Sequence, residues 1–139
     1  MFWKILYPSV PVIAIITGEG CSGGALGLAV ADRVMMLEHA YYTVISPEGC
    51  ASILWRDAAR FADAAEALKI TSKDLLELGI IDEEIKEPTG GAHTDYQKTA
   101  DNMKKAIMNA IKELSKLSVE KLREERYNKF RTMSRFIES

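Results

Sequence analysis

The sequence has few of the residues that build metal centres and redox sites. Among its 139 residues there are two cysteines, Cys21 and Cys50, and two histidines. The cysteines share no metal-ligand spacing and have no histidine or cysteine cluster beside them. We therefore expect no metal in this chain and a reduced thiol pair of the kind found in the cytosol, with a disulfide as the alternative.

Long apolar runs and an excess of one charge are also lacking. The longest apolar run, Val10 to Ile16, has strand length and falls far short of the roughly 20 residues that a membrane helix needs. Met1–Tyr7 carries Lys4 as its single charge and leads to no small-residue cleavage site, so it does not resemble a signal peptide. The formal charge of -2 gives no reason to expect nucleic acid. We expect a cytoplasmic protein that binds neither membrane nor nucleic acid.

What the first half does contain is an alternation of strands and helices. Val10–Thr17 is rich in Val and Ile without alternation, which is typical of a strand buried on both faces. Gly18–Gly24 holds four glycines in seven residues and predicts a turn, after which Ala25–Ala31 has the length of a helix. Arg33–Leu37 and Tyr41–Ile45 are predicted as further strands. The order indicates an α/β fold.

Later signals are mostly local. The elements that we expect are a turn at Ser46–Gly49, a short helix from Cys50 to Trp55, a helix over Arg56–Leu68, a helix Ser72–Leu78 opened by a Thr71–Asp74 capping box and ended by Gly79, and a strand over Ile80–Ile85.

Beyond Asp95 the sequence becomes helical. Apolar residues from Met103 to Leu117 recur three or four apart, which predicts one stripe on a long helix, packed in the core or against another subunit. Ser118 is placed to cap a final helix with Glu120 in its first turn. We divide the chain into a core over 1–93 and a C-terminal helical region over 94–139.

The glycine turn is the one motif with clear chemical potential. Gly23 and Gly24 precede the predicted helix, whose first N–H groups lack partners and carry the positive end of the dipole. Such amides can hold a charge that develops during reaction, and losing one donor of this kind typically costs on the order of 3 kcal/mol. Ala25 follows Gly24, so the run does not fit a P-loop. A tight turn without a ligand is the alternative.

Several stretches closely resemble the α-subunit family of bacterial acetyl-CoA carboxylase carboxyltransferases. The resemblance covers Val10 to Arg131, and its Ser46–Trp55 run separates this family from its relatives. The similar stretches are Gly18–Leu26 with Asp32, Val44–Trp55, Ala64–Leu68, Glu87–His93 and the tail around Arg126-Tyr127.

The resemblance implies a crotonase-type superhelix of stacked ββα turns, with residues 1–93 as a partial carboxyltransferase core. It also implies transfer of carboxylate from carboxybiotin to acetyl-CoA, giving malonyl-CoA for fatty-acid biosynthesis. The implied partners are a carboxyltransferase β subunit and a separate biotin carboxyl carrier protein in a hetero-oligomer. In the family no side chain is an evident general base, and the biotin ureido nitrogen takes the proton of acetyl-CoA.

The resemblance also assigns roles within the turn. Gly23 and Gly24 are the backbone oxyanion hole for the ureido oxygen of carboxybiotin, with Gly20 and Ser22 shaping the turn. The β partner holds the thioester enolate. Members of the family are longer, and Met1–Ser9 does not resemble them, so we expect a fragment or a naturally truncated copy whose strand edges need cover.

Three functional hypotheses follow. The first is a catalytic component that is active only with a β subunit, and the second is a non-catalytic remnant that acts as an interaction module. The third, an enoyl-CoA hydratase or isomerase, needs two glutamates, but Leu26 stands where the first belongs. We expect Glu48 to be structural and His93 to be solvated or capping.

Neither of the two remaining candidates receives a catalytic role. We assign no role to His39, which precedes the predicted Tyr41–Ile45 strand. Cys21 has no basic neighbour in the sequence that would favour its thiolate, so we do not expect a nucleophile.

Overall fold

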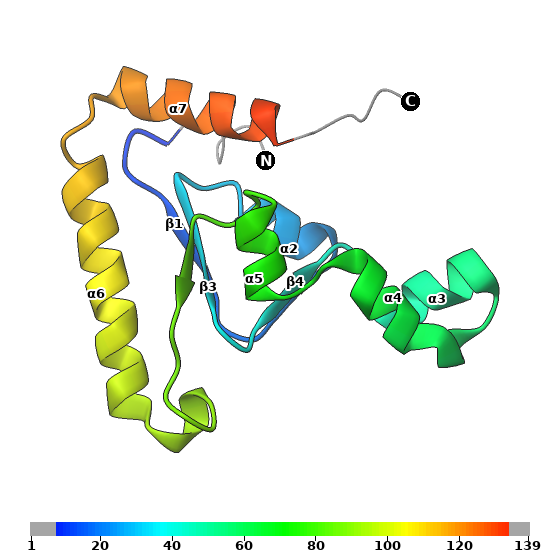
Figure 1. The fold of residues 1–139 in the computed structure, drawn as a ribbon. Helices are drawn as coiled ribbons and strands as arrows, with labels where there is room; N and C mark the ends of the chain where they lie inside the picture. Colours follow the sequence, from blue (N-terminus) through cyan, green and yellow to red (C-terminus); the bar gives the residue numbers. More distant parts are fainter. Residues whose placement is uncertain (1–7, 134–139) are drawn as a thin grey trace.

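The computed structural model describes residues 8–133, and its elements alternate in the expected α/β order (Figure 1). The predictions for Met1–Tyr7 lie outside the described residues. Parallel strands form two sheets. One has the order β1-β3-β5, with β1 at Ile13–Ile16, β3 at Arg33–Leu37 and β5 at Glu83–Ile85; the other pairs β2 (Glu19–Cys21) with β4 (Tyr41–Thr43).

The helices follow the strands in the order of a ββα superhelix. β1 and β2 lead into a helix, and so do β3 and β4, with one strand of each pair in each sheet. The helical segments are α2 (Ser22–Leu28), α3 (Pro47–Trp55), η1 (Ala58–Arg60), α4 (Phe61–Leu68), α5 (Ser72–Glu77), η2 (Ala92–Thr94), α6 (Tyr96–Leu114) and α7 (Val119–Thr132).

Three predicted elements are present with other bounds: the helix expected over Ala25–Ala31 is α2, and the strands expected over Tyr41–Ile45 and Ile80–Ile85 are the shorter β4 and β5. Two further predictions are wrong, each for an identifiable reason. The predicted turn at Ser46–Gly49 is the beginning of α3: Ser46 is its N-cap, and its hydroxyl accepts the Gly49 N–H at 3.1 Å. Pro47 occupies the first helical position, where its missing N–H costs nothing. The predicted helix over Arg56–Leu68 begins later, because Arg56 is left-handed (φ 56°) and ends α3.

Capping signals predicted the later boundaries correctly. The Thr71 hydroxyl oxygen accepts the Asp74 N–H at the start of α5, and Gly79 follows that helix with φ 69°. The Ser118 hydroxyl accepts the Lys121 N–H at the start of α7. These signals act over three residues, so they do not depend on the rest of the fold.

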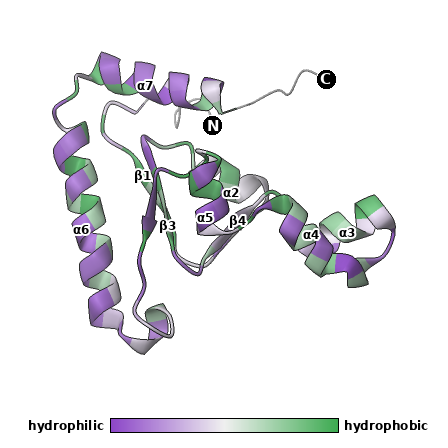
Figure 2. Ribbon diagram, in the orientation of Figure 1, coloured by the Kyte–Doolittle hydropathy of each residue, from purple (hydrophilic) through white to green (hydrophobic). Residues whose placement is uncertain are grey.

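The main core lies around β3, which is buried from Val34 to Leu37. Helix α6 contributes Ala106 and Ala110 to this core. The predicted α6 stripe is turned slightly, since Ala106 is buried while Ile111 is exposed. Figure 2 shows hydrophilic and hydrophobic residues alternating along α6, as in an amphipathic helix. Because α6 shares the core of the sheet, the division at residue 93 stays a prediction.

None of the helices in the described part of the chain combines the length and apolar character that a bilayer crossing requires.

Candidate active site at the glycine turn

The glycine segment is not the simple turn that its composition predicts. Glu19–Cys21 form β2, whose Cys21 lies opposite Thr43 of β4. The reason is non-local, because pairing with a strand some 20 residues away outweighs the low strand propensity of glycine. α2 begins directly at Ser22, so Gly23 and Gly24 are its second and third residues. Their N–H groups therefore belong to the first turn, which an α-helix leaves without internal partners.

These amides are open to a ligand. No side-chain cap bonds them, and the first turn of α2 holds no acidic residue. A Cβ placed on Gly23 would meet nothing within 4 Å, and on Gly24 it would meet only the Ser22 hydroxyl at 3.9 Å. Both glycines are exposed. The structure thus leaves room for another molecule to approach the backbone closely at this point.

Gly20 and Ser22 shape the turn by different means. A Cβ on Gly20 would lie 3.0 Å from the Tyr42 ring, so packing between β2 and β4 demands a glycine there. Ser22 has φ 69°, whereas Gly20, Gly23 and Gly24 lie outside the left-handed region. The strained backbone is thus at the serine, at a cost of roughly 1–2 kcal/mol. Such outliers persist where the surrounding structure holds them in place.

The turn forms one wall of an open groove of about 570 Å³ that runs along β1 and reaches Ala25 and Leu28 of α2. Within residues 8–133 β1 pairs only with β3, so its other edge faces this groove without a strand partner. The titratable side chains that line it are Glu19 and Cys21. Burial, and then the neighbouring Glu19 carboxylate, raise the pKa of Tyr41.

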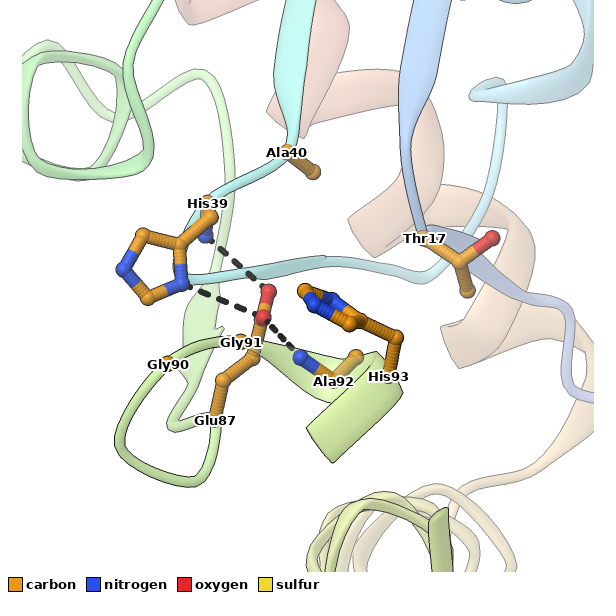
Figure 3. Close-up of a pocket in the computed structure, with 8 residues that line it drawn as sticks. All are labelled: Thr17, His39, Ala40, Glu87, Gly90, Gly91, Ala92 and His93. Atoms are coloured by element: carbon orange, nitrogen blue, oxygen red, sulfur yellow. Dashed lines mark hydrogen bonds and ion pairs between the residues drawn. The ribbon is translucent and has the colours of Figure 1, made fainter. Parts of the chain in front are cut away.

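A smaller pocket of about 320 Å³ lies at the ends of β3 and β5 (Figure 3). The buried carboxylate of Glu87 accepts the N–H groups of His39 at 3.1 Å and Ala92 at 2.7 Å. The same carboxylate lies 3.1 Å from Nδ1 of His39. Burial raises the pKa of Glu87, but the hydrogen bonds from His39 and Ala92 outweigh it and hold the pKa below its ordinary value. Glu87 thus joins two loops.

The other candidate residues have modest surroundings. No role was predicted for His39 from the sequence. In the structure its imidazole is the partner of the Glu87 carboxylate. His93 is exposed beside the pocket, as predicted (Figure 3). Glu48 is exposed in the first turn of α3, where a carboxylate favours the helix dipole, in line with a structural role. Cys21 and Cys50 are free thiols.

Sequence reasoning missed one buried ion pair, between Asp32 and Arg126. Its residues are 94 positions apart, so no spacing rule could have found them. The available signal was that both fall in the stretches that carry the family resemblance.

Residues 3–134 match the family described as acetyl co-enzyme A carboxylase carboxyltransferase-like. The match includes residues 3–9, so the expectation that Met1–Ser9 does not resemble the family is wrong. The acetyl-coenzyme A carboxylase carboxyl transferase α subunits of Geobacter metallireducens and Synechococcus elongatus are 61% and 56% identical. Each alignment covers 94% of this chain, but only 41% and 40% of the respective relative. The chain thus spans about two fifths of the length of these relatives and matches their C-terminal part.

A solved structure extends the comparison to the fold. Transcarboxylase 12S, a hexameric multienzyme core with methylmalonyl-coenzyme A and methylmalonic acid bound, matches with a TM-score of 0.64 at 19% identity. The alignment covers 83% of this chain and 22% of the transcarboxylase chain. The expected α/β, crotonase-like fold class is confirmed by this likeness. With its glycine turn, its ββα order and a family match over nearly its whole length, the chain belongs to the acetyl-CoA carboxylase carboxyltransferase family.

Proposed function

We propose that this chain is the α-type carboxyltransferase component of an acetyl-CoA carboxylase, transferring carboxylate from carboxybiotin to acetyl-CoA to form malonyl-CoA. The observation that carries the proposal is the pair of open amides at Gly23 and Gly24, in the first turn of α2 and next to the groove that residues 18–21 and Ala25 line. The activity requires a β-type subunit and a biotin carboxyl carrier protein as partners. We place this assembly in the cytoplasm.

The residues present fit a biotin ureido oxygen. The first turn of α2 has no capping side chain and no carboxylate that would repel a developing anion. The space above Gly23 is open, since a Cβ there would meet nothing within 4 Å, and an oxygen can therefore reach its N–H. When bound, carboxybiotin supplies the carboxylate to be transferred and a base for the acetyl-CoA proton.

The residues of this chain then act by position and by their dipoles. The N–H groups of Gly23 and Gly24 direct their partial positive charges at one oxygen, and the N-terminal end of α2 adds its positive dipole. The titratable side chains of the groove are Glu19 and Cys21, and we assign a general-base role to neither. The chain therefore contributes a half-site, and the β partner provides the hole for the thioester enolate.

The test is an assay of malonyl-CoA decarboxylation with free biotin, after mixing the full chain with a β subunit. We expect activity above that of the β subunit alone, and its absence would leave the non-catalytic interaction module as the better account. Gly24→Val should abolish the activity because its side chain fills the approach to the amides. Leu26→Val is the matched control, since it places the same side chain in α2 two residues after Gly24, beyond the first-turn amides.

Two outcomes bear on the details of the proposal. If Gly24→Val remains active, the oxyanion assignment is wrong even if the chain is a carboxyltransferase component. The hydratase hypothesis gains no support from the fold, because Leu26 occupies α2 where that chemistry needs a carboxylate. Hydration of crotonyl-CoA by the assembled protein would revive it.

A further inference from the structure

The helix that carries the proposed oxyanion amides has little stability of its own. α2 is seven residues long, three of them glycines, and it contains no buried residue. Helices this short do not form by themselves in water, and each internal glycine costs about 1 kcal/mol relative to alanine. Its placement therefore depends on the packing of Ala25 against the main core and on what holds its two ends. At the near end, pairing of Cys21 with Thr43 fixes the N-cap.

The far end is held by Asp32, in the link between α2 and β3. Its N–H donates to the Val12 carbonyl at 2.9 Å, and its Oδ2 accepts the Val12 N–H at 2.7 Å. These two bonds join the link after α2 to the residue before β1. The carboxylate is almost fully buried, with 3% of the side chain exposed. A charge at such a site requires a compensating partner.

That partner comes from the C-terminal helix. Arg126 of α7 donates from Nε to Oδ1 of Asp32 at 2.9 Å and from Nη2 to Oδ2 at 2.6 Å, a two-point contact that fixes direction as well as distance. Nη2 also lies 3.4 Å from the Val10 carbonyl. Figure 1 shows α7 lying across the end of the sheet where β1 begins. The Arg126 guanidinium thus contacts both the segment before β1 and the link between α2 and β3.

We infer that Asp32 and Arg126 are positioning residues, which hold α2 and thereby aim the Gly23 and Gly24 amides. The inference rests on the proposed function for its catalytic consequence, but its structural content does not. The site then depends on α7 through Arg126, whose hydrogen bonds go to Asp32 and Val10. Losing the pair should loosen α2 before it loosens the sheets.

The fold supplies a control with the same backbone motif but a more exposed carboxylate, since 29% of the Asp82 side chain is exposed. Asp82 exchanges the same two bonds with Val34, both at 2.7 Å, and receives Lys129 from α7. Asp82 follows α5 and leads into β5, so it stands at the end of no site helix. Asp32→Asn and Asp82→Asn therefore remove one negative charge from the same motif at two places, only one of which supports α2.

The deciding measurement is amide hydrogen exchange on the full chain. In Asp32→Asn, exchange over residues 22–28 should rise about tenfold or more, the change expected when a buried charged hydrogen bond is lost. In Asp82→Asn, exchange over 22–28 should stay as in the unaltered chain while that of β5 rises. Equal exchange over 22–28 in the two variants would overturn the inference.

Turnover gives the second readout. With a β subunit, Asp32→Asn should lower kcat for decarboxylation while leaving KM for malonyl-CoA unchanged, whereas Asp82→Asn should leave both unchanged. If Asp32→Asn raises exchange selectively over 22–28 but the unaltered chain has no activity with a β subunit, the proposed function is refuted and the positioning inference stands. If Asp32→Asn raises exchange selectively over 22–28 but keeps the kcat of the unaltered chain, only the catalytic consequence of the inference is overturned.

A conservative variant covers the case in which Asp32→Asn does not fold. Arg126→Lys keeps the positive charge but loses the two-point contact. It should raise exchange over 22–28 by less than Asp32→Asn, with kcat lowered in proportion. If Arg126→Lys folds and leaves exchange over 22–28 unchanged, the positioning role is refuted.

Discussion

Asp32 and Asp82 hold equivalent positions on neighbouring parallel strands. Each directly precedes its strand and exchanges two hydrogen bonds with the backbone of a valine, Val12 or Val34, and each accepts a cation from α7. Arg126 and Lys129 are three residues apart, so both lie on one face of that helix. The superhelix therefore repeats a side-chain device that the sequence does not reveal as a repeat, because the residues that flank the two aspartates differ.

Breaking the buried pair should be costly. Arg126→Met leaves Asp32 without its counter-charge, and we expect a loss of about 3–5 kcal/mol in the free energy of unfolding. The double variant Asp32→Asn with Arg126→Met should lose less than the sum of the single variants, because no unpaired charge then remains buried. Urea denaturation of the four proteins gives the coupling. Additive losses would show that the two side chains do not act as a pair.

Gly20 and Gly24 should respond oppositely to alanine. Gly24→Ala gains helix propensity without a clash and should stabilise the protein slightly, by up to about 1 kcal/mol. Gly20→Ala places a Cβ 3.0 Å from the Tyr42 ring, so strand or ring must shift, and we expect a loss of about 1–3 kcal/mol. Thermal unfolding followed by circular dichroism separates the two. A Gly20→Ala protein as stable as the unaltered chain would refute the packing role.

The free energy of unfolding should depend on pH in part through the ionisation of Glu87. Its pKa lies below the ordinary 4.5, so the folded state favours the ionised carboxylate. The resulting stabilisation is fully present above the unfolded value and is lost as the pH falls through the folded pKa. Glu87→Gln, which orphans one donor, should cost roughly 1–3 kcal/mol near pH 7 and less near pH 3.

Urea midpoints at the two pH values measure this difference. His39→Ala is the control, since it removes the exposed imidazole but keeps the backbone N–H that Glu87 accepts. It should cost less than Glu87→Gln at pH 7. A cost for Glu87→Gln that does not change with pH would contradict the role of the ionised carboxylate.

What the sequence predicted correctly depends on short-range physics. The bounds of β3 came from five consecutive residues suited to a strand, and the start of α7 from one capping serine. The glycine segment was found because a glycine run joins a strand to helix-forming residues, which is again local, although Gly23 and Gly24 lie inside α2 and not before it. The start of α3 was missed although Pro47 is a good first residue of a helix, because Ser46–Gly49 has the composition of a turn as well.

What the sequence could not predict depends on partners far away. β2 exists because β4 pairs with it, and Glu87 meets His39 across 48 positions. The residues of the Asp32–Arg126 pair are 94 positions apart in the sequence. An isolated aspartate or arginine has the composition of a solvated surface residue, and burial becomes plausible only when the tertiary fold supplies its counter-charge.

Ser22 and Gly79 share a φ of 69°, which makes opposite substitutions at these positions a test of backbone strain. Ser22→Gly removes the Cβ penalty and should raise the free energy of unfolding by up to about 1 kcal/mol, after the entropy of the new glycine is subtracted. Gly79→Ser introduces the same penalty and should lower it by about 1 kcal/mol or more. Equilibrium unfolding in urea measures both. If Ser22→Gly is also less stable, the left-handed serine is not strained, and its hydroxyl beside Gly24 must instead contribute to holding the turn.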